Sequence, residues 1–177
     1  MRPADLTPVA RDVMKLPASV GLMFCSILGA YLLAVLPWSG RALLARPDFI
    51  LIVLLFWALH EPRSIGQGFA FSLGLLMDVS DSMLLGQHAL AYVVAMFGAQ
   101  VLRVRILSFG LAEQTLHVFG LTAIAGAVML VLNLLLGADF PGWAYFVSPA
   151  LTALLWPVVS WLLYTPAVRR RRREGAK

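Results

Sequence analysis

The strongest constraint on the fold of this chain is a series of apolar runs, four of which are long enough to cross a lipid bilayer. A helix crosses the hydrocarbon layer with about 20 apolar residues. Runs of about this length cover residues 18–36, 84–102, 116–136 and 146–164. With 60% hydrophobic and only 13% charged residues, the 177-residue chain has too little polar surface for a water-soluble fold. The sequence therefore predicts a polytopic membrane protein with a single domain.

Two further apolar runs, 49–59 and 65–77, are too short to cross a bilayer by themselves. The first covers only about 17 Å of a hydrocarbon layer about 30 Å thick. Either the two runs form a re-entrant pair, or each helix includes its polar flanks. We favour the second arrangement, in which one helix begins near Leu43 and the next continues past Asp78. Asp48 and Asp78 then lie at or just below the membrane surface, where charges are tolerated at modest cost.

Counting these runs predicts an all-α polytopic membrane bundle of about six transmembrane helices. The bundle covers residues 18–166, between a basic tail at 1–17 and an arginine-rich tail at 167–177. With six crossings, 12 of the 14 basic residues lie on the side of the termini, which the positive-inside rule assigns to the cytoplasm. A re-entrant pair would leave this orientation unchanged. The two basic residues on the other side are Arg41 and Arg46.

The basic charge of the chain, with a pI near 10.0, is placed at the ends of the apolar runs. This placement indicates membrane orientation and contact with anionic lipid, and no nucleic-acid partner is expected. The run Arg169 to Arg173 has two interpretations. It is either a topology anchor held by anionic lipid, which we favour, or a contact for an acidic cytoplasmic partner.

Small residues recur every fourth position in two of the apolar runs. Gly66, Ala70, Gly74 and Asp78 lie along one edge of a helix that has almost no side chains until it reaches a carboxylate. A second edge of the same spacing is formed by Ala91, Ala95 and Ala99. In lipid, close backbone approach along small residues is a main source of helix association. The first edge therefore predicts a partner helix in this chain or another, and the second edge is its expected mate.

Asp78 sharpens this prediction, because an ionised carboxylate well inside a bilayer costs about 2.5 to 3.5 kcal/mol. Its side chain should face protein, water or headgroups, where it would make a polar contact or cap a helix. The alternative is that residues 78–82 form a turn outside the membrane, in which Asp81 or Ser82 caps the next helix. Gly86, at the entrance of that helix, is expected to allow close backbone approach or to close a turn.

No enzymatic or cofactor motif stands out in this chain. The sequence has no G-x-S-x-G, H-E-x-x-H, C-x-x-C or glycine-rich phosphate loop. The apolar runs hold no row of buried acids and bases such as a proton pathway uses. We therefore expect no catalytic residue, no metal and no cofactor.

The stretch from Pro47 to about Arg103 resembles the rod-shape-determining protein MreD family. The likeness is carried by glycines and one acid at fixed intervals: Arg46-Pro47-Asp48-Phe49, Trp57-Ala58-Leu59, Gly66, Gly68-Phe69, Gly74-Leu75, Asp78, Leu85-Gly86 and Ala89-Leu90. The resemblance implies a bacterial inner-membrane protein of the elongation machinery that builds the peptidoglycan side wall. The partners it implies are MreC, MreB, RodA and the penicillin-binding transpeptidase of RodA. The family is also similar in fold to the six-helix substrate-binding subunits of energy-coupling-factor vitamin transporters.

The two small-residue edges and the missing catalytic groups predict a non-enzymatic scaffold that holds a single-pass partner helix, which the resemblance implies is MreC. Pro47 and Asp48 are expected to shape one end of the pair of helices formed by the two short apolar runs. Arg103 is expected to lie at the membrane interface. The competing hypothesis is a subunit that binds a small molecule or lipid, with Asp78, Asn133 or Gln100 reaching the ligand. An enzyme acting on a lipid-linked precursor is a third possibility, which the missing acidic pair and metal set weaken.

Overall fold

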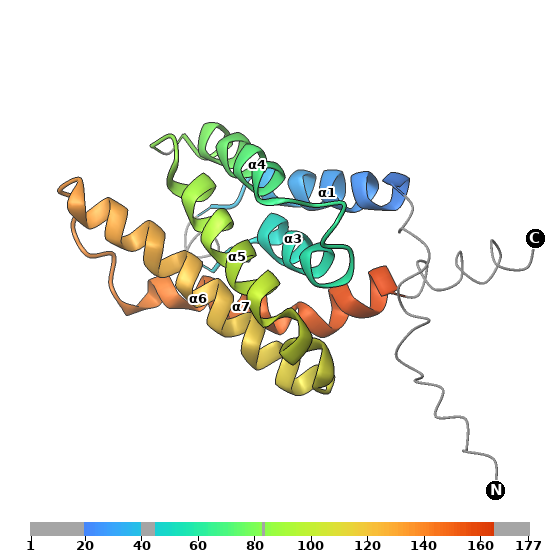
Figure 1. The fold of residues 1–177 in the computed structure, drawn as a ribbon. Coiled ribbons are helices and arrows are strands. Elements are labelled where there is room, and N and C mark those ends of the chain that lie inside the picture. The colour runs from blue at the N-terminus through green and yellow to red at the C-terminus, as the bar shows by residue number, and fades with distance from the viewer. Residues whose placement is uncertain (1–19, 40–44, 83, 165–177) are drawn as a thin grey trace, which may run out of the picture.

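A computed structural model describes residues 20–39, 45–82 and 84–164 (Figure 1). These residues form helices joined by short connections and contain no strand. The helices are α1 (Val20–Val35), α3 (Phe49–His60), α4 (Gln67–Ser80), α5 (Gln87–Ser108), α6 (Leu111–Leu135), the 3-10 helix η2 (Trp143–Phe146) and α7 (Val147–Leu154), after which residues 156–164 are again helical. The predicted membrane helical bundle is thereby confirmed in its class.

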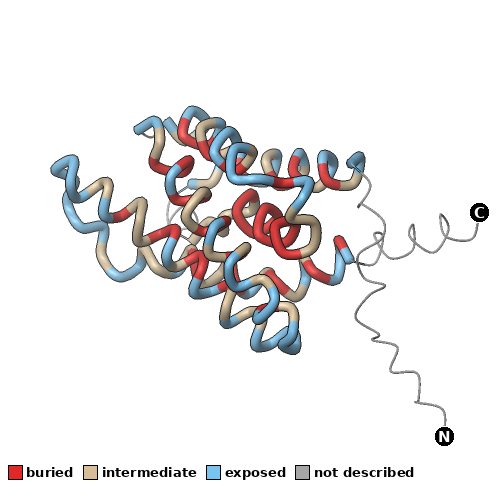
Figure 2. Tube along the Cα trace, viewed as in Figure 1, coloured by how far each residue is buried: buried red, intermediate tan, exposed pale blue. Residues whose placement is uncertain are grey.

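Helix α3 lies at the centre of the bundle, and all ten residues from Ile50 to Leu59 are buried (Figure 2). A helix that is apolar on every side can be stable only where other helices surround it. Its indole at Trp57 donates a hydrogen bond of 2.9 Å to Ser26 Oγ of α1. The run that looked too short to cross a membrane is therefore the core of the protein.

Helix α3 does not begin near Leu43, so this part of our prediction is wrong. The helix begins at Phe49, because the Asp48 side chain accepts a hydrogen bond from Leu51 N at 2.9 Å and caps the helix there. Helix α4 does continue past Asp78, as far as Ser80. With 12 residues, α3 is about 18 Å long, well short of the hydrocarbon thickness.

Three helical stretches of the described chain are long and apolar enough to cross a membrane: α5, α6 and Trp143–Tyr164. Helices α1 and α3 are shorter apolar helices. The number of crossings therefore stays a prediction. The helices alternate in direction, so the α1–α3, α4–α5 and α6–η2 connections lie at one end of the bundle and the α3–α4 and α5–α6 connections at the other (Figure 1).

The last stretch is interrupted where α7 ends at Leu154 and the helix resumes at Trp156. The cause is Pro157, which lacks a backbone N–H and whose ring crowds the carbonyl four residues earlier. Both parts of this stretch pack on the bundle, since Ala153 before the interruption and Trp156 after it are buried.

Both ends of the buried α3 helix are capped by charged side chains from outside it. Asp48 caps the start, and at the far end Arg103 Nε of α5 donates a hydrogen bond of 2.6 Å to Leu59 O. The last four carbonyls of a helix have no partner within it, and burying one unpaired is costly. Arg103 thus fixes the depth at which α5 passes the end of α3.

We expect Arg103→Met to lower the free energy of unfolding by about 1 to 3 kcal/mol, because it keeps the apolar stem but removes a charged donor from a buried carbonyl. Arg105→Met, on the exposed side of the same helix, is the matched control and should change stability by less than about 0.5 kcal/mol. Thermal unfolding of the purified proteins in one detergent measures both. Equal losses for the two variants would show that the capping bond contributes nothing.

Candidate functional site

The small-residue edge of α4 packs directly against the start of α5. A Cβ atom added at Gly74 would lie 2.5 Å from Ala89 N and 2.8 Å from His88 C, and closer still to Ala89 Cα. Real Cβ atoms do not come this close to non-bonded atoms, so only glycine allows the two backbones to approach this closely. Ala70 is also fully buried, whereas Gly66 is exposed and a Cβ atom added there would meet nothing within 4 Å. The edge is therefore packed from Ala70 onward.

Asp78, at the end of this edge, is fully buried and caps the neighbouring helix. Its carboxylate accepts hydrogen bonds from Gly86 N at 2.7 Å and from His88 N at 2.8 Å, and its Oδ1 lies 2.9 Å from His88 Nδ1. Gly86 adopts φ +104°, a left-handed conformation that favours glycine. A side chain of α4 thus pairs the free N–H groups at the start of α5.

The alternative in which Asp81 or Ser82 caps the next helix is wrong. Gly86 occupies the N-cap position of α5, and the capping oxygens come from Asp78. Asp81 follows the last residue of α4 and ends that helix instead. The two acids therefore have different roles. Asp78 is buried within the protein, whereas Asp81 lines the cavity described below.

The second edge, formed by Ala91, Ala95 and Ala99, is completely buried within this chain. It is not the surface that meets Gly74, because Ala89 lies about 120° around the helix from Ala95. Both edges are therefore used to pack this chain on itself. Apart from the exposed Gly66, the small residues of the two edges are not open to a second protein.

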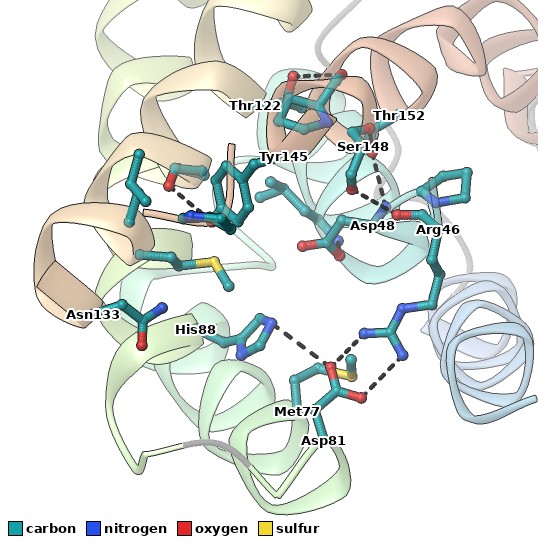
Figure 3. A pocket seen from close by; sticks show the side chains of 18 of the residues that line it. Arg46, Asp48, Met77, Asp81, His88, Thr122, Asn133, Tyr145, Ser148 and Thr152 are labelled. Atoms are coloured by element: carbon teal, nitrogen blue, oxygen red, sulfur yellow. Dashed lines mark hydrogen bonds and ion pairs between the residues drawn. The ribbon is translucent and has the colours of Figure 1, made fainter. Parts of the chain in front are cut away.

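A cavity of about 500 Å³ opens beside this seam, at the end of the bundle that holds the α1–α3 and α4–α5 connections (Figure 3). It is within the size range of small-molecule sites in proteins. Its walls come from every part of the bundle. Its lining includes Ala34, Arg46, Pro47, Asp48, Leu51, Met77, Asp81, His88, Thr122, Ala125, Gly126, Met129, Leu130, Asn133, Ala138, Asp139, Pro141, Tyr145, Ser148, Pro149 and Thr152.

Arg46 and Asp81 form an ion pair on one wall of this cavity. The guanidinium makes two hydrogen bonds to the carboxylate and a third, at 3.1 Å, to Ala34 O at the end of α1. The hydrogen bond to Asp81 raises the pKa of Arg46, which keeps the guanidinium charged. This pair joins the end of α1 to the end of α4.

Asp48 links three elements at the base of the cavity. Its Oδ1 accepts hydrogen bonds from Leu51 N at 2.9 Å and Tyr92 OH at 2.8 Å, while its own N–H donates to Thr152 Oγ1 at 2.8 Å. Burial raises the pKa of the Asp48 carboxyl, and the nearby His88 acts in the opposite direction. Pro47, just before it, lines the same cavity.

Most hydroxyl and amide groups around the cavity are paired with the protein itself. Ser148 donates to Arg46 O at 2.6 Å and Tyr145 donates to Gly126 O at 3.0 Å. Asn133 Oδ1 accepts from Gln87 Nε2 at 2.6 Å. Of the three side chains expected to reach a ligand, Asn133 lines the cavity, whereas Asp78 and Gln100 are not among the lining residues.

The sequence analysis did not group the residues that form this cavity. Arg46, Asp81 and His88 come from three separate connections or helix ends, and Thr152 lies 104 residues beyond its partner Asp48. No local spacing links them. The described residues contain no group of three His, Cys, Asp or Glu side chains placed to hold a metal ion.

Comparison with known proteins gives two matches and one negative result. The family described as rod shape-determining protein MreD matches residues 16–165. A protein from Haemophilus influenzae (strain ATCC 51907 / DSM 11121 / KW20 / Rd), named Rod shape-determining protein MreD, is 28% identical over 134 residues, covering 76% of this chain and 83% of the relative. No solved structure matches the chain significantly. The expected likeness to vitamin-transporter subunits therefore stays a prediction.

Proposed function

This chain belongs to the MreD family of rod shape-determining proteins, and from that premise we propose that it is a non-enzymatic scaffold that binds MreC. The proposed place of action is the bacterial inner membrane, which the chain crosses several times. MreB, RodA and the penicillin-binding transpeptidase of RodA are the further proposed members of the complex, with anionic lipid at the cytoplasmic side. The family match over residues 16–165 is the observation that carries this proposal.

The burial of both small-residue edges changes where a partner is expected to bind. Ala70, Gly74 and Ala95 are buried against this chain's own helices, so an MreC helix has no access to them. The outer faces of the bundle instead present large apolar side chains. Four helical stretches each present an exposed aromatic residue suited to a test: Phe24, Phe97, Phe119 and Trp161. We therefore place the MreC contact on the outer surface of the bundle.

Replacing these four aromatic residues one at a time with the photo-crosslinking residue benzoylphenylalanine tests the proposal. Each replacement is close in shape to the native side chain and points away from the core. We expect at least one position to give a cross-link to MreC in membranes, because a bound single-pass helix must cover part of this surface. Positions on one side of the bundle should cross-link and those on the opposite side should not.

Phe56, at the centre of α3 and 1% exposed, is the matched control position and should give no cross-link to MreC. The proposal would be contradicted if MreC cross-linked at none of the four outer positions and did not co-purify with the unmodified protein.

A further inference from the structure

We propose that the cavity beside the α4–α5 seam is a binding site for a primary ammonium group carried on a partly apolar molecule. This inference goes beyond the scaffold function and holds whether or not MreC binds. It follows from which hydrogen-bonding atoms of the cavity are already paired within the protein and which are left for a ligand.

An anionic ligand is disfavoured, because the lining includes three aspartates, Asp48, Asp81 and Asp139, and one arginine. Among the described lining residues, Arg46 is the only arginine or lysine, and its guanidinium is held by both oxygens of Asp81 and by Ala34 O. The hydroxyl groups that could donate to an anion are also engaged, with Tyr145 bonded to Gly126 O and Thr122 to Pro149 O. The cavity therefore has few free donors.

Acceptor atoms, in contrast, remain free. Asp48 uses Oδ1 for both of its side-chain hydrogen bonds, and Oδ2 has no hydrogen-bond partner among the described residues. This carboxylate makes no hydrogen bond to Arg46, whose guanidinium is bonded to Asp81 and Ala34 O. Asp48 is half-buried, so Oδ2 remains open to a donor from a ligand, above all a charged one.

His88 lies on the facing wall of the cavity, where Asp78 holds its ring in place (Figure 3). The residue is 5% exposed, and its Nδ1 is bonded to the Asp78 carboxylate at 2.9 Å. Because a carboxylate accepts, Nδ1 carries a proton and donates it to Asp78. Asp81 Oδ2 is 3.8 Å from Nε2, which is too far for a hydrogen bond.

An ammonium group matches this pattern, since it brings a positive charge and three donors to the unpaired Oδ2 of Asp48. A third acid, Asp139, lines the cavity from the exposed loop before η2. The remaining walls are apolar, including Leu51, Met129 and Leu130, and fit an alkyl portion of the ligand. Two sources share this chemistry: a free alkylamine and the amine headgroup of phosphatidylethanolamine.

The test uses the purified full-length protein and a matched set of probes. Hexylamine, hexanol and hexanoate have the same chain and differ in charge and donors. Thermal unfolding in detergent at increasing concentrations of each reports binding, because a ligand of the folded state raises the Tm. Native mass spectrometry of protein from nanodiscs of phosphatidylethanolamine or phosphatidylglycerol tests the lipid source in parallel.

Asp48→Asn is the sharpest variant, because an amide keeps Oδ1 as an acceptor for the α3 cap and Tyr92 and replaces only the free oxygen. We expect it to weaken amine binding at least tenfold. Asp139→Asn lies in an exposed loop and should weaken binding by a smaller factor without affecting the fold. Glu113→Gln, an exposed acid at the far end of the bundle, is the control and should bind as the unmodified protein does.

Two results together support the site with a free amine as ligand. Hexylamine raises the Tm more than hexanol and hexanoate do, and this rise is smaller in Asp48→Asn. Retention of phosphatidylethanolamine in preference to phosphatidylglycerol, lost in the same variant, supports it with a lipid headgroup as ligand. Equal effects of the three probes with no lipid preference would overturn the proposal. So would amine binding that is unchanged in both Asp48→Asn and Asp139→Asn.

Discussion

Gly74→Ala is expected to destabilise the fold by about 3 kcal/mol or more, so that little folded protein accumulates in the membrane. The added methyl group would overlap the backbone of Ala89 and His88, which has no rotamer to change. Helices α4 and α5 would have to separate, and the separation would lengthen the bonds from Asp78 to the start of α5. The measurement is the yield and thermal stability of the purified variant.

Gly68→Ala is the matched control on the same helix, because a Cβ atom at Gly68 meets nothing within 4 Å. Alanine has the higher helix propensity by about 1 kcal/mol, so this variant should be as stable as the native protein or slightly more stable. Similar yields and melting temperatures for the two variants would show that α4 and α5 are not in contact at Gly74.

Asp78→Ala is the second change with a large expected effect, a loss of about 3 to 5 kcal/mol in the free energy of unfolding. The substitution leaves the N–H groups of Gly86 and His88 buried without acceptors and removes the partner of the imidazole. Because Asp78 is fully buried and His88 nearly so, leaving these groups unpaired is costly. Thermal or denaturant unfolding in detergent measures the loss.

Two comparison variants separate the hydrogen bonds of Asp78 from its charge. Asp78→Asn keeps one acceptor oxygen and should retain part of the stability, falling between the native protein and Asp78→Ala. Asp139→Ala removes an exposed acid at the same end of the bundle and should leave the melting temperature nearly unchanged. If Asp78→Ala and Asp139→Ala had the same melting temperature, the buried carboxylate of Asp78 would have no structural role.

The class of the fold could be predicted from the sequence because the apolar runs and small-residue spacings are local patterns. Composition and run length predicted a membrane helical bundle, and the spacing of Ala70, Gly74 and Asp78 marked a helix edge that the structure packs against α5. The start of α3 was placed wrongly because a capping residue outweighs the need to cover the bilayer. Helix α3 begins directly after Asp48, whose side chain accepts a hydrogen bond from Leu51 N.

The cavity could not be predicted for a different reason. Its polar residues are brought together by tertiary packing, with Asp48, His88 and Thr152 contributed by distant parts of the chain. Each residue alone reads as an ordinary interfacial or turn residue. The contact of Gly74 with Ala89, and not with the alanine edge, also depends on how α5 is rotated about its axis, which spacing alone does not give.

The central claim is that the α4 edge is an internal seam that builds the bundle, and that MreC binds elsewhere. The most direct test is the amount of MreC captured per folded molecule of Gly74→Ala and of Asp78→Asn, with folded protein quantified by size-exclusion chromatography. The account predicts fewer folded molecules but the same capture of MreC by each one. A variant that melts like the native protein and no longer captures MreC would contradict it.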